Sequence, residues 1–220
     1  DEATFMIYND DRNVHTETGG QKMGIEVHAM LYGYKRPGSP LDSTVFINYK
    51  IYNRSASGYH DVYLGQWIDF DLGAPGDDYV GGDVGNSMFY AYNGTPNDGG
   101  SPIPGNGTYG ANPPAQGAML IHGPEADSAD GLDNNRNGLI DEVGEDWQLS
   151  NFMYYENNFT VTGNPVTAAH YYNYMKSYWV DGTPLTYGGT GYGGTTNATF
   201  MFPGTSDPLG WGTNMVPQAP

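Results

Sequence analysis

The residues best suited to chemistry lie between Asp130 and Glu142, in the stretch DGLDNNRNGLIDE. Oxygen-bearing side chains recur there at alternate positions, namely Asp133, Asn135 and Asn137. Calcium is a hard cation that takes about six to eight oxygen ligands, so a loop that wraps around it must offer oxygens at short intervals. This spacing, followed directly by Gly138, is the opening of an EF-hand-like calcium loop.

The end of this loop departs from the EF-hand pattern. The twelfth position from Asp133 is Gly144, where a bidentate glutamate is usual, so Asp141, Glu142 or Glu145 would have to replace it. We expect Leu139 and the adjacent Ile140 to anchor the loop in a core. The predicted calcium ligands are Asp130, Asp133, Asn135, Asn137, the Leu139 carbonyl, Asp141 and Glu142. The alternative is a solvated turn rich in asparagine and glycine.

A second acidic stretch, IDFDLGAPGDDYVGGD, ends about fifty residues before the first one begins. Its carboxylates are Asp69, Asp71, Asp77, Asp78 and Asp83. No basic residue lies nearby in sequence to offset the repulsion between these carboxylates. One interpretation is that they bind a second cation, which would offset it. A solvated acidic loop is another. Paired carboxylates could also act as acid and base, as in glycoside hydrolysis, with Asp69, Asp71, Asp77 or Asp78 as the candidates.

Charge and composition narrow the function classes. The net charge is −17, and from Ser55 onward only two basic residues face 18 acidic ones. Such a surface repels nucleic acid and anionic membranes. No apolar run approaches the roughly 20 residues of a membrane span. The absence of cysteine excludes disulfides and thiolate metal sites, so long loops need another staple, which calcium can supply.

Hydrophobic periodicity and the 33 glycines and 15 prolines indicate short strands joined by long loops. We predict strands at residues 4–8, 23–34, 45–53, 61–71, 88–93, 118–122, 149–155 and 199–202, and one short helix within 165–179. The predicted fold is mainly β: a single antiparallel, jelly-roll-like β-sandwich over residues 1–220. Long calcium-pinned loops are expected at about 72–117 and 123–148.

The N-terminal segment suggests a route to assembly. Up to Arg54 the chain carries six basic and seven acidic residues, so it is nearly neutral. It begins with a short apolar run, Thr4, Phe5, Met6, Ile7 and Tyr8. Such a run can add as a strand to an exposed sheet edge of another copy. The alternative is that it pairs within its own sheet.

The chain also resembles an uncharacterised region of large secreted proteins of Bacteroidota, of the type exported by type IX secretion. The blocks that carry the resemblance span Gly24 to Trp211 in the order GIEVHAMLYGY, VFINYKIYN, YLGQWIDFDLGAPGDDYVGGD, YGANPPAQGAMLIHGP, HYYNYMKSYWVDGTPLTYGG and FMFPGTSDPLGW. The family usually has a cysteine after DDYVGG, where this chain has Asp83. The resemblance implies an extracellular or cell-surface location and O-glycosylation at Ser43 and Ser128, within DST and DSA.

These observations predict a non-enzymatic, calcium-stabilised extracellular module that serves as a cell-surface or filament building block. One calcium ion is expected and a second is possible. The partners would be further copies or neighbouring surface domains. A calcium-dependent carbohydrate-binding or adhesion module, with glycans as ligands, is the first alternative. A hydrolase built on the Asp69–Asp78 carboxylates is the second. Serine hydrolase, zinc-protease and P-loop motifs are absent from the sequence.

Overall fold

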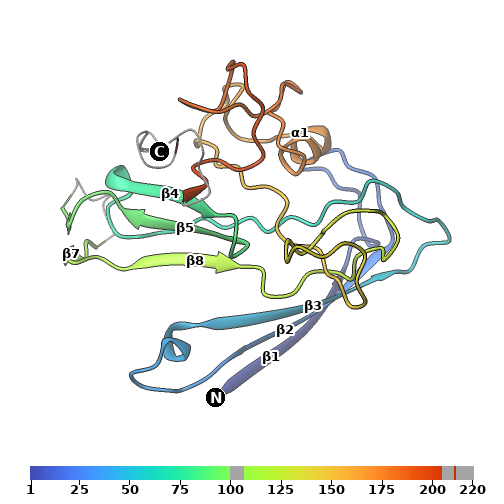
Figure 1. Cartoon of the computed structure of the whole chain (residues 1–220), viewed down its shortest axis with the longest axis horizontal. Coiled ribbons are helices and arrows are strands. Elements are labelled where there is room, and N and C mark those ends of the chain that lie inside the picture. Colours follow the sequence, from blue (N-terminus) through green and yellow to red (C-terminus); the bar gives the residue numbers. More distant parts are fainter. Residues whose placement is uncertain (100–106, 205–210, 212–220) are drawn as a thin grey trace. The chain divides into compact units, whose positions relative to one another are not determined.

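The computed structural model describes residues 1–99, 107–204 and 211. The fold is mainly β, with antiparallel sheets and one short helix in the described residues (Figure 1). The chain forms two compact units. The first unit holds Asp1–Val62 with Val166–Ala168, and the second holds Tyr63–Pro165 with Ala169–Pro220. No helix in the described part of the chain is long and apolar enough to cross a membrane.

The first unit is built on a three-stranded antiparallel sheet. Its strands are β1 (Glu2–Asn9), β2 (Ile25–Gly33) and β3 (Val45–Asn53), in that spatial order, with the 3-10 turn η1 (Pro40–Ser43) between β2 and β3. The alternating pattern of residues 23–34 and 45–53 therefore predicted β2 and β3 correctly. The predicted strand at 4–8 pairs with β2, as the alternative interpretation held, and leaves β1 at the edge of the described sheet.

One face of this sheet is mostly apolar. Cross-strand partners share a face, and the register aligns Met6, Ala29 and Tyr49 in one row. The apolar side chains of this face are Met6, Tyr8, Ile25, Val27, Ala29, Leu31, Val45, Ile47, Tyr49 and Ile51, and Glu2, Thr4 and Asn53 lie on the same face. Only Ala29 is fully buried, whereas Ile47 is 45% exposed. The opposite face mixes the charged or titratable residues Glu26, His28 and Lys50 with apolar and aromatic ones, which are Phe5, Ile7, Met30, Tyr32, Phe46 and Tyr52.

Asp10 fixes the loop that joins β1 to β2. Its carboxylate accepts hydrogen bonds from the Met23 N–H at 2.6 Å and the Ile25 N–H at 2.8 Å, and its own N–H donates to the Ile25 carbonyl at 3.2 Å. Burial alone would raise the pKa of Asp10, but these backbone donors outweigh it and hold the pKa below its ordinary value. The ionised carboxylate thus stabilises the start of β2.

Replacing Asp10 by Ala should lower the free energy of unfolding by about 1–2 kcal/mol at neutral pH, because two charge-assisted hydrogen bonds are lost. The folded-state pKa is lowered, so this stabilisation is present above the ordinary pKa of 3.8 and disappears as pH falls through the lowered value. Denaturant unfolding curves of both proteins at pH 7 and pH 3 measure the loss of stability and its dependence on pH. Asp11→Ala is the matched control, because its carboxylate only approaches Lys22 at 3.9 Å. An equal loss in both variants would contradict the role of Asp10.

The second unit contains a sheet where a long loop was expected. The strands β4 (Asp78–Asp83), β5 (Met88–Asn93) and β8 (Ala115–Met119) form it in that order, and β6 (Asn97–Asp98) pairs with β7 (Gly110–Ala111). The 3-10 turn η2 (Pro75–Asp77) precedes β4. The long loop expected at about 72–117 therefore contains five strands, of which only β5 was predicted correctly. Glycine in β4 hid the strand: a Cβ on Gly81 would lie 2.6 Å from the Tyr90 ring, which covers this position.

Three other predicted strands need correction. Residues 61–71 form no strand, and Val62 and Leu64 are exposed there, because alternation alone cannot supply a neighbouring strand for pairing. Residues 149–155 and 199–202 contribute only an isolated parallel bridge between Phe152 and Phe200. The strand predicted at 118–122 begins earlier, as β8. The predicted helix is present as α1 (Ala168–Tyr174).

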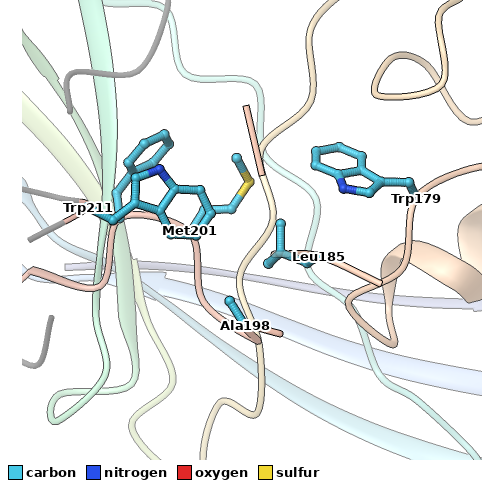
Figure 2. Close-up of a cluster of buried hydrophobic side chains, with 6 residues drawn as sticks. Trp179, Leu185, Ala198, Met201 and Trp211 are labelled. Atoms are coloured by element: carbon cyan, nitrogen blue, oxygen red, sulfur yellow. The ribbon is translucent and has the colours of Figure 1, made fainter. Parts of the chain in front are cut away.

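The hydrophobic core of the second unit is formed mainly by turns and loops. Figure 2 shows its buried side chains, which are Trp179, Leu185, Ala198, Met201, Phe202 and Trp211. The indole N–H of Trp179 donates to the Gly191 carbonyl at 2.9 Å, so this buried polar group is satisfied. Gly191 has φ +80°, and a Cβ there would lie 2.7 Å from Leu185, so this close approach requires glycine.

Candidate metal centre

The predicted calcium loop is closed at its base by a short backbone clamp. The Ala126 N–H donates to the Glu145 carbonyl at 2.9 Å, and the Trp147 N–H donates to the Pro124 carbonyl at 2.8 Å. Gly123 allows this approach, because a Cβ there would lie 1.8 Å from the Trp147 carbonyl oxygen. The loop at residues 123–148 contains an isolated bridge but no strand of its own.

The alternating oxygens of the loop are organised around its glycine. The Asp133 carboxylate accepts from the Asn137 N–H at 3.1 Å and from the Gly138 N–H at 2.9 Å. The Asn137 side-chain oxygen accepts from the Leu139 N–H at 2.8 Å. Gly138 adopts φ +92°, which confirms the expected sharp turn. The predicted core anchors were wrong: Leu139 and Ile140 are 60% and 62% exposed.

Glu142 lies beside the two asparagines. One of its oxygens, Oε1, accepts from the side-chain amides of Asn135, at 2.8 Å, and Asn137. The amide of Asn135 lowers the pKa of Glu142 most strongly, and Asn137 adds to this, while burial and Asp133 oppose it. The other oxygen, Oε2, is buried and has no hydrogen-bond partner among the described residues.

Glu145 is the most deeply buried carboxylate at the loop. Its side chain is 1% exposed, Oε1 accepts from the Asn134 N–H, and Oε2 has no hydrogen-bond partner among the described residues. Burying a carboxylate without a hydrogen-bond donor or a cation costs desolvation free energy. A bound cation at this oxygen would offset that cost. The sequence placed Glu145 only as a substitute for the missing glutamate, one residue after Gly144. Burial makes it a principal candidate.

Asp130 and Asp141 support the loop from its two ends. Asp130 accepts from the Leu132 N–H at 2.9 Å and from the Asn134 side-chain amide at 3.1 Å. Asp141 accepts from the Gly131 N–H at 3.0 Å and has φ +55°. Each oxygen that accepts one hydrogen bond keeps a second lone pair, so both residues retain the capacity to bind a cation.

The charge balance of the loop favours a cation. Residues 127–146 include seven carboxylates and one basic residue, Arg136. Its guanidinium donates to the carbonyls of Val84, at 3.2 Å, and Leu149, at 2.6 Å, so part of its hydrogen-bonding capacity is used outside the loop. Burial lowers the pKa of Arg136, and Asp133 opposes that effect.

The donors present fit calcium better than a softer metal. Carboxylate, amide and carbonyl oxygens are hard ligands, and the buried oxygens of Glu142 and Glu145 lack partners in the described part of the chain. No group of three histidine, cysteine or acidic side chains within the described residues has metal-ligating geometry. A calcium ion would therefore also use amide and main-chain oxygens, such as those of Asn135, Asn137 and Leu139.

The structure brings together only part of the second predicted set. Asp77 and Asp71 both act on the pKa of Asp78. Asp83 lies at the far end of β4, where its carboxylate accepts from the Asn86 N–H at 3.1 Å and the Asn86 side-chain amide at 2.8 Å. Asp69 lies near a different residue, Tyr155. Burial raises the pKa of Tyr155, and Tyr171 and Asp69 add to this effect.

Asp98 was missed by the sequence analysis. It stands alone in a Gly/Pro-rich stretch, without a neighbouring acidic residue as a signal. Its side chain is 1% exposed and accepts from the N–H groups of Ala74, at 3.0 Å, and Tyr109. Burial, with Asp77 and then Asp98, raises the pKa of Asp78 to about 6. The fold therefore gathers carboxylates that are distant in sequence.

Ser43 and Ser128, the predicted glycosylation sites, are both exposed, and their modification stays a prediction. No protein-family model, curated protein or solved structure compared with this chain matches it. The resemblance to Bacteroidota surface proteins also stays a prediction. The functional argument therefore depends on the residues themselves.

Proposed function

We propose that this chain is a calcium-stabilised structural module of an extracellular or cell-surface protein. The observation that carries the proposal is the buried carboxylate of Glu145, in a loop with the spacing of calcium ligands. One of its oxygens has no hydrogen-bond partner among the described residues. The predicted jelly-roll-like sandwich, with loops pinned by calcium, belongs to this proposal. The module acts by holding its shape and position, and it has no catalytic role.

The loop needs such a staple because little else holds it. Leu132, Leu139 and Ile140 are all exposed, so they contribute little hydrophobic burial. The polar side chains bond mostly to backbone groups within the loop, where water can compete for them. An ion that binds several oxygens from both ends of the loop holds these ends together. Because the oxygens converge only in the folded protein, the ion binds the folded state alone. Its binding energy then adds to the stability of the fold.

Calcium should raise the melting temperature of the chelator-treated protein by several degrees. Binding to the native state alone contributes about 4 kcal/mol at a thousandfold excess over the dissociation constant. Glu145→Gln should lose most of this calcium response, because it removes a buried charged ligand. Glu125 is exposed and pairs with Asp146 in the isolated bridge of the clamp, so Glu125→Gln removes the same charge and should keep the response. Calorimetric melts with calcium and with chelator make the comparison.

Equal melting temperatures with calcium and with chelator would contradict the proposal. If both glutamate variants keep the calcium response, Glu145 is not a ligand of the ion.

The apolar face of the first unit supports the role of a building block. Its apolar side chains on β1 and β3, such as Met6, Ile47 and Ile51, are substantially exposed, and these two are the outer strands of the described sheet. Residues 1–54 have a charge of only −1, from six basic and seven acidic residues, whereas the rest of the chain is strongly acidic. Repulsion between copies is therefore weakest here, and we assign self-association to this sheet.

Ile47→Lys should shift any self-association toward monomers, because it places a charge on the apolar face. Asn48→Lys is the matched control: it adds the same charge at the next residue of β3, whose side chain lies on the opposite face. Sedimentation equilibrium of both variants and the parent chain measures the effect. Equal dissociation in both variants, or a parent chain that stays monomeric at high concentration, would contradict this assembly role.

A further inference from the structure

Three buried oxygen atoms without hydrogen-bond partners lie around the junction of η2, β4 and β5. They are Oδ1 of Asp77, Oδ1 of Asp78 and Oδ1 of Asn93, and none has a partner among the described residues. Asp78 and Asn93 are direct cross-strand partners, so their side chains share a face with Cβ atoms about 5 Å apart. The Gly94 N–H donates to the Asp77 carbonyl at 2.7 Å, which ties Asp77 to the end of β5.

The hydrogen bonds of Asn93 use its side-chain nitrogen and leave its buried oxygen as an acceptor. Its side-chain amide donates to the Thr95 carbonyl at 2.7 Å and contacts the Thr95 hydroxyl at 3.3 Å. The nitrogen is thus used outside the cluster, and the buried oxygen is left as an acceptor. An amide oxygen beside two carboxylates gains nothing from them, because all three groups are acceptors.

The surroundings add negative charge to this cluster. The side chains that raise the pKa of Asp78 are Asp77, Asp98 and Asp71, and burial is the largest cause. The Leu72 N–H is the one group that opposes them. Asp98 cannot supply a donor, because its own carboxylate accepts from Ala74 and Tyr109.

We propose that Asp77, Asp78 and Asn93 form a second calcium site, which links η2 and β4 to the end of β5. The three unpartnered oxygens are the hard ligands that calcium prefers, and water or main-chain oxygens can complete its coordination. This site goes beyond the proposed function, because none of its residues belongs to the Asp130–Glu145 loop.

The competing explanation is that Asp78 is protonated, but a proton gives hydrogen-bond partners to fewer of the three oxygens than a cation does. A protonated Asp78 has one O–H, which can donate to one neighbouring oxygen. Of the three unpartnered atoms, at least one would still lack a partner. A divalent cation can contact all three at once and also offsets the repulsion between Asp77 and Asp78.

Calcium titration of the chelator-treated full chain, followed by calorimetry, tests the proposal. The parent chain should bind two calcium ions. Asp133→Ala should bind one, at the second site, and the double variant D77N/D78N should bind one, at the loop. Asp83→Asn is the matched control, because it makes the same change on the same strand where the carboxylate is already satisfied by Asn86. This control should still bind two ions.

A parent chain that binds one ion, lost in Asp133→Ala and kept in D77N/D78N, would overturn the second site alone. One ion kept in Asp133→Ala and lost in D77N/D78N would overturn the loop site and support this one. Near-ultraviolet circular dichroism checks that each variant is folded. If the double variant unfolds, Asn93→Asp decides: a calcium site predicts at least severalfold tighter binding from the added charge. Unchanged or weaker calcium affinity in Asn93→Asp would overturn the proposal.

Discussion

The structure depends on how buried carboxylate oxygens are compensated. The chain has 25 acidic residues and 8 basic ones, so most carboxylates cannot find a cationic side chain. Exposed carboxylates are solvated by water at little cost. A buried one needs N–H donors or a cation, since its desolvation otherwise costs several kcal/mol, on the order of the whole stability of a domain. Glu145 is the clearest case, because it is 1% exposed and one of its oxygens lacks a partner in the described structure.

Backbone donors solve the same problem elsewhere in the chain. Asp10 receives N–H groups from Met23 and Ile25, which lower its pKa without any ion. Asp98 is as buried as Glu145, and both of its oxygens accept backbone N–H groups. Asp77 and Asp78 each keep a buried oxygen without a donor among the described residues. The contrast separates carboxylates that organise the backbone from those that we assign to calcium.

The sequence predicted those features that short periodic patterns determine. Strict alternation located β2 and β3, and the spacing of Asp133, Asn135 and Asn137 predicted the turn at Gly138. Features that depend on distant residues escaped it. Gly81 lies in a strand because Tyr90 covers it, and Asn93 reaches Asp78 only through the β4–β5 register. Residues 61–71 alternate as a strand would, but no strand in the described part of the chain pairs with them.

Amide hydrogen exchange with and without calcium tests the central claim most directly. The amides of Asn134, Asn137 and Gly138 donate to Glu145 and Asp133, so calcium bound there should slow their exchange by about tenfold or more. The amides of Met23 and Ile25, held by Asp10 in the first unit, should exchange at nearly the same rate in calcium and in chelator. Identical protection of the loop amides in both conditions would contradict the account.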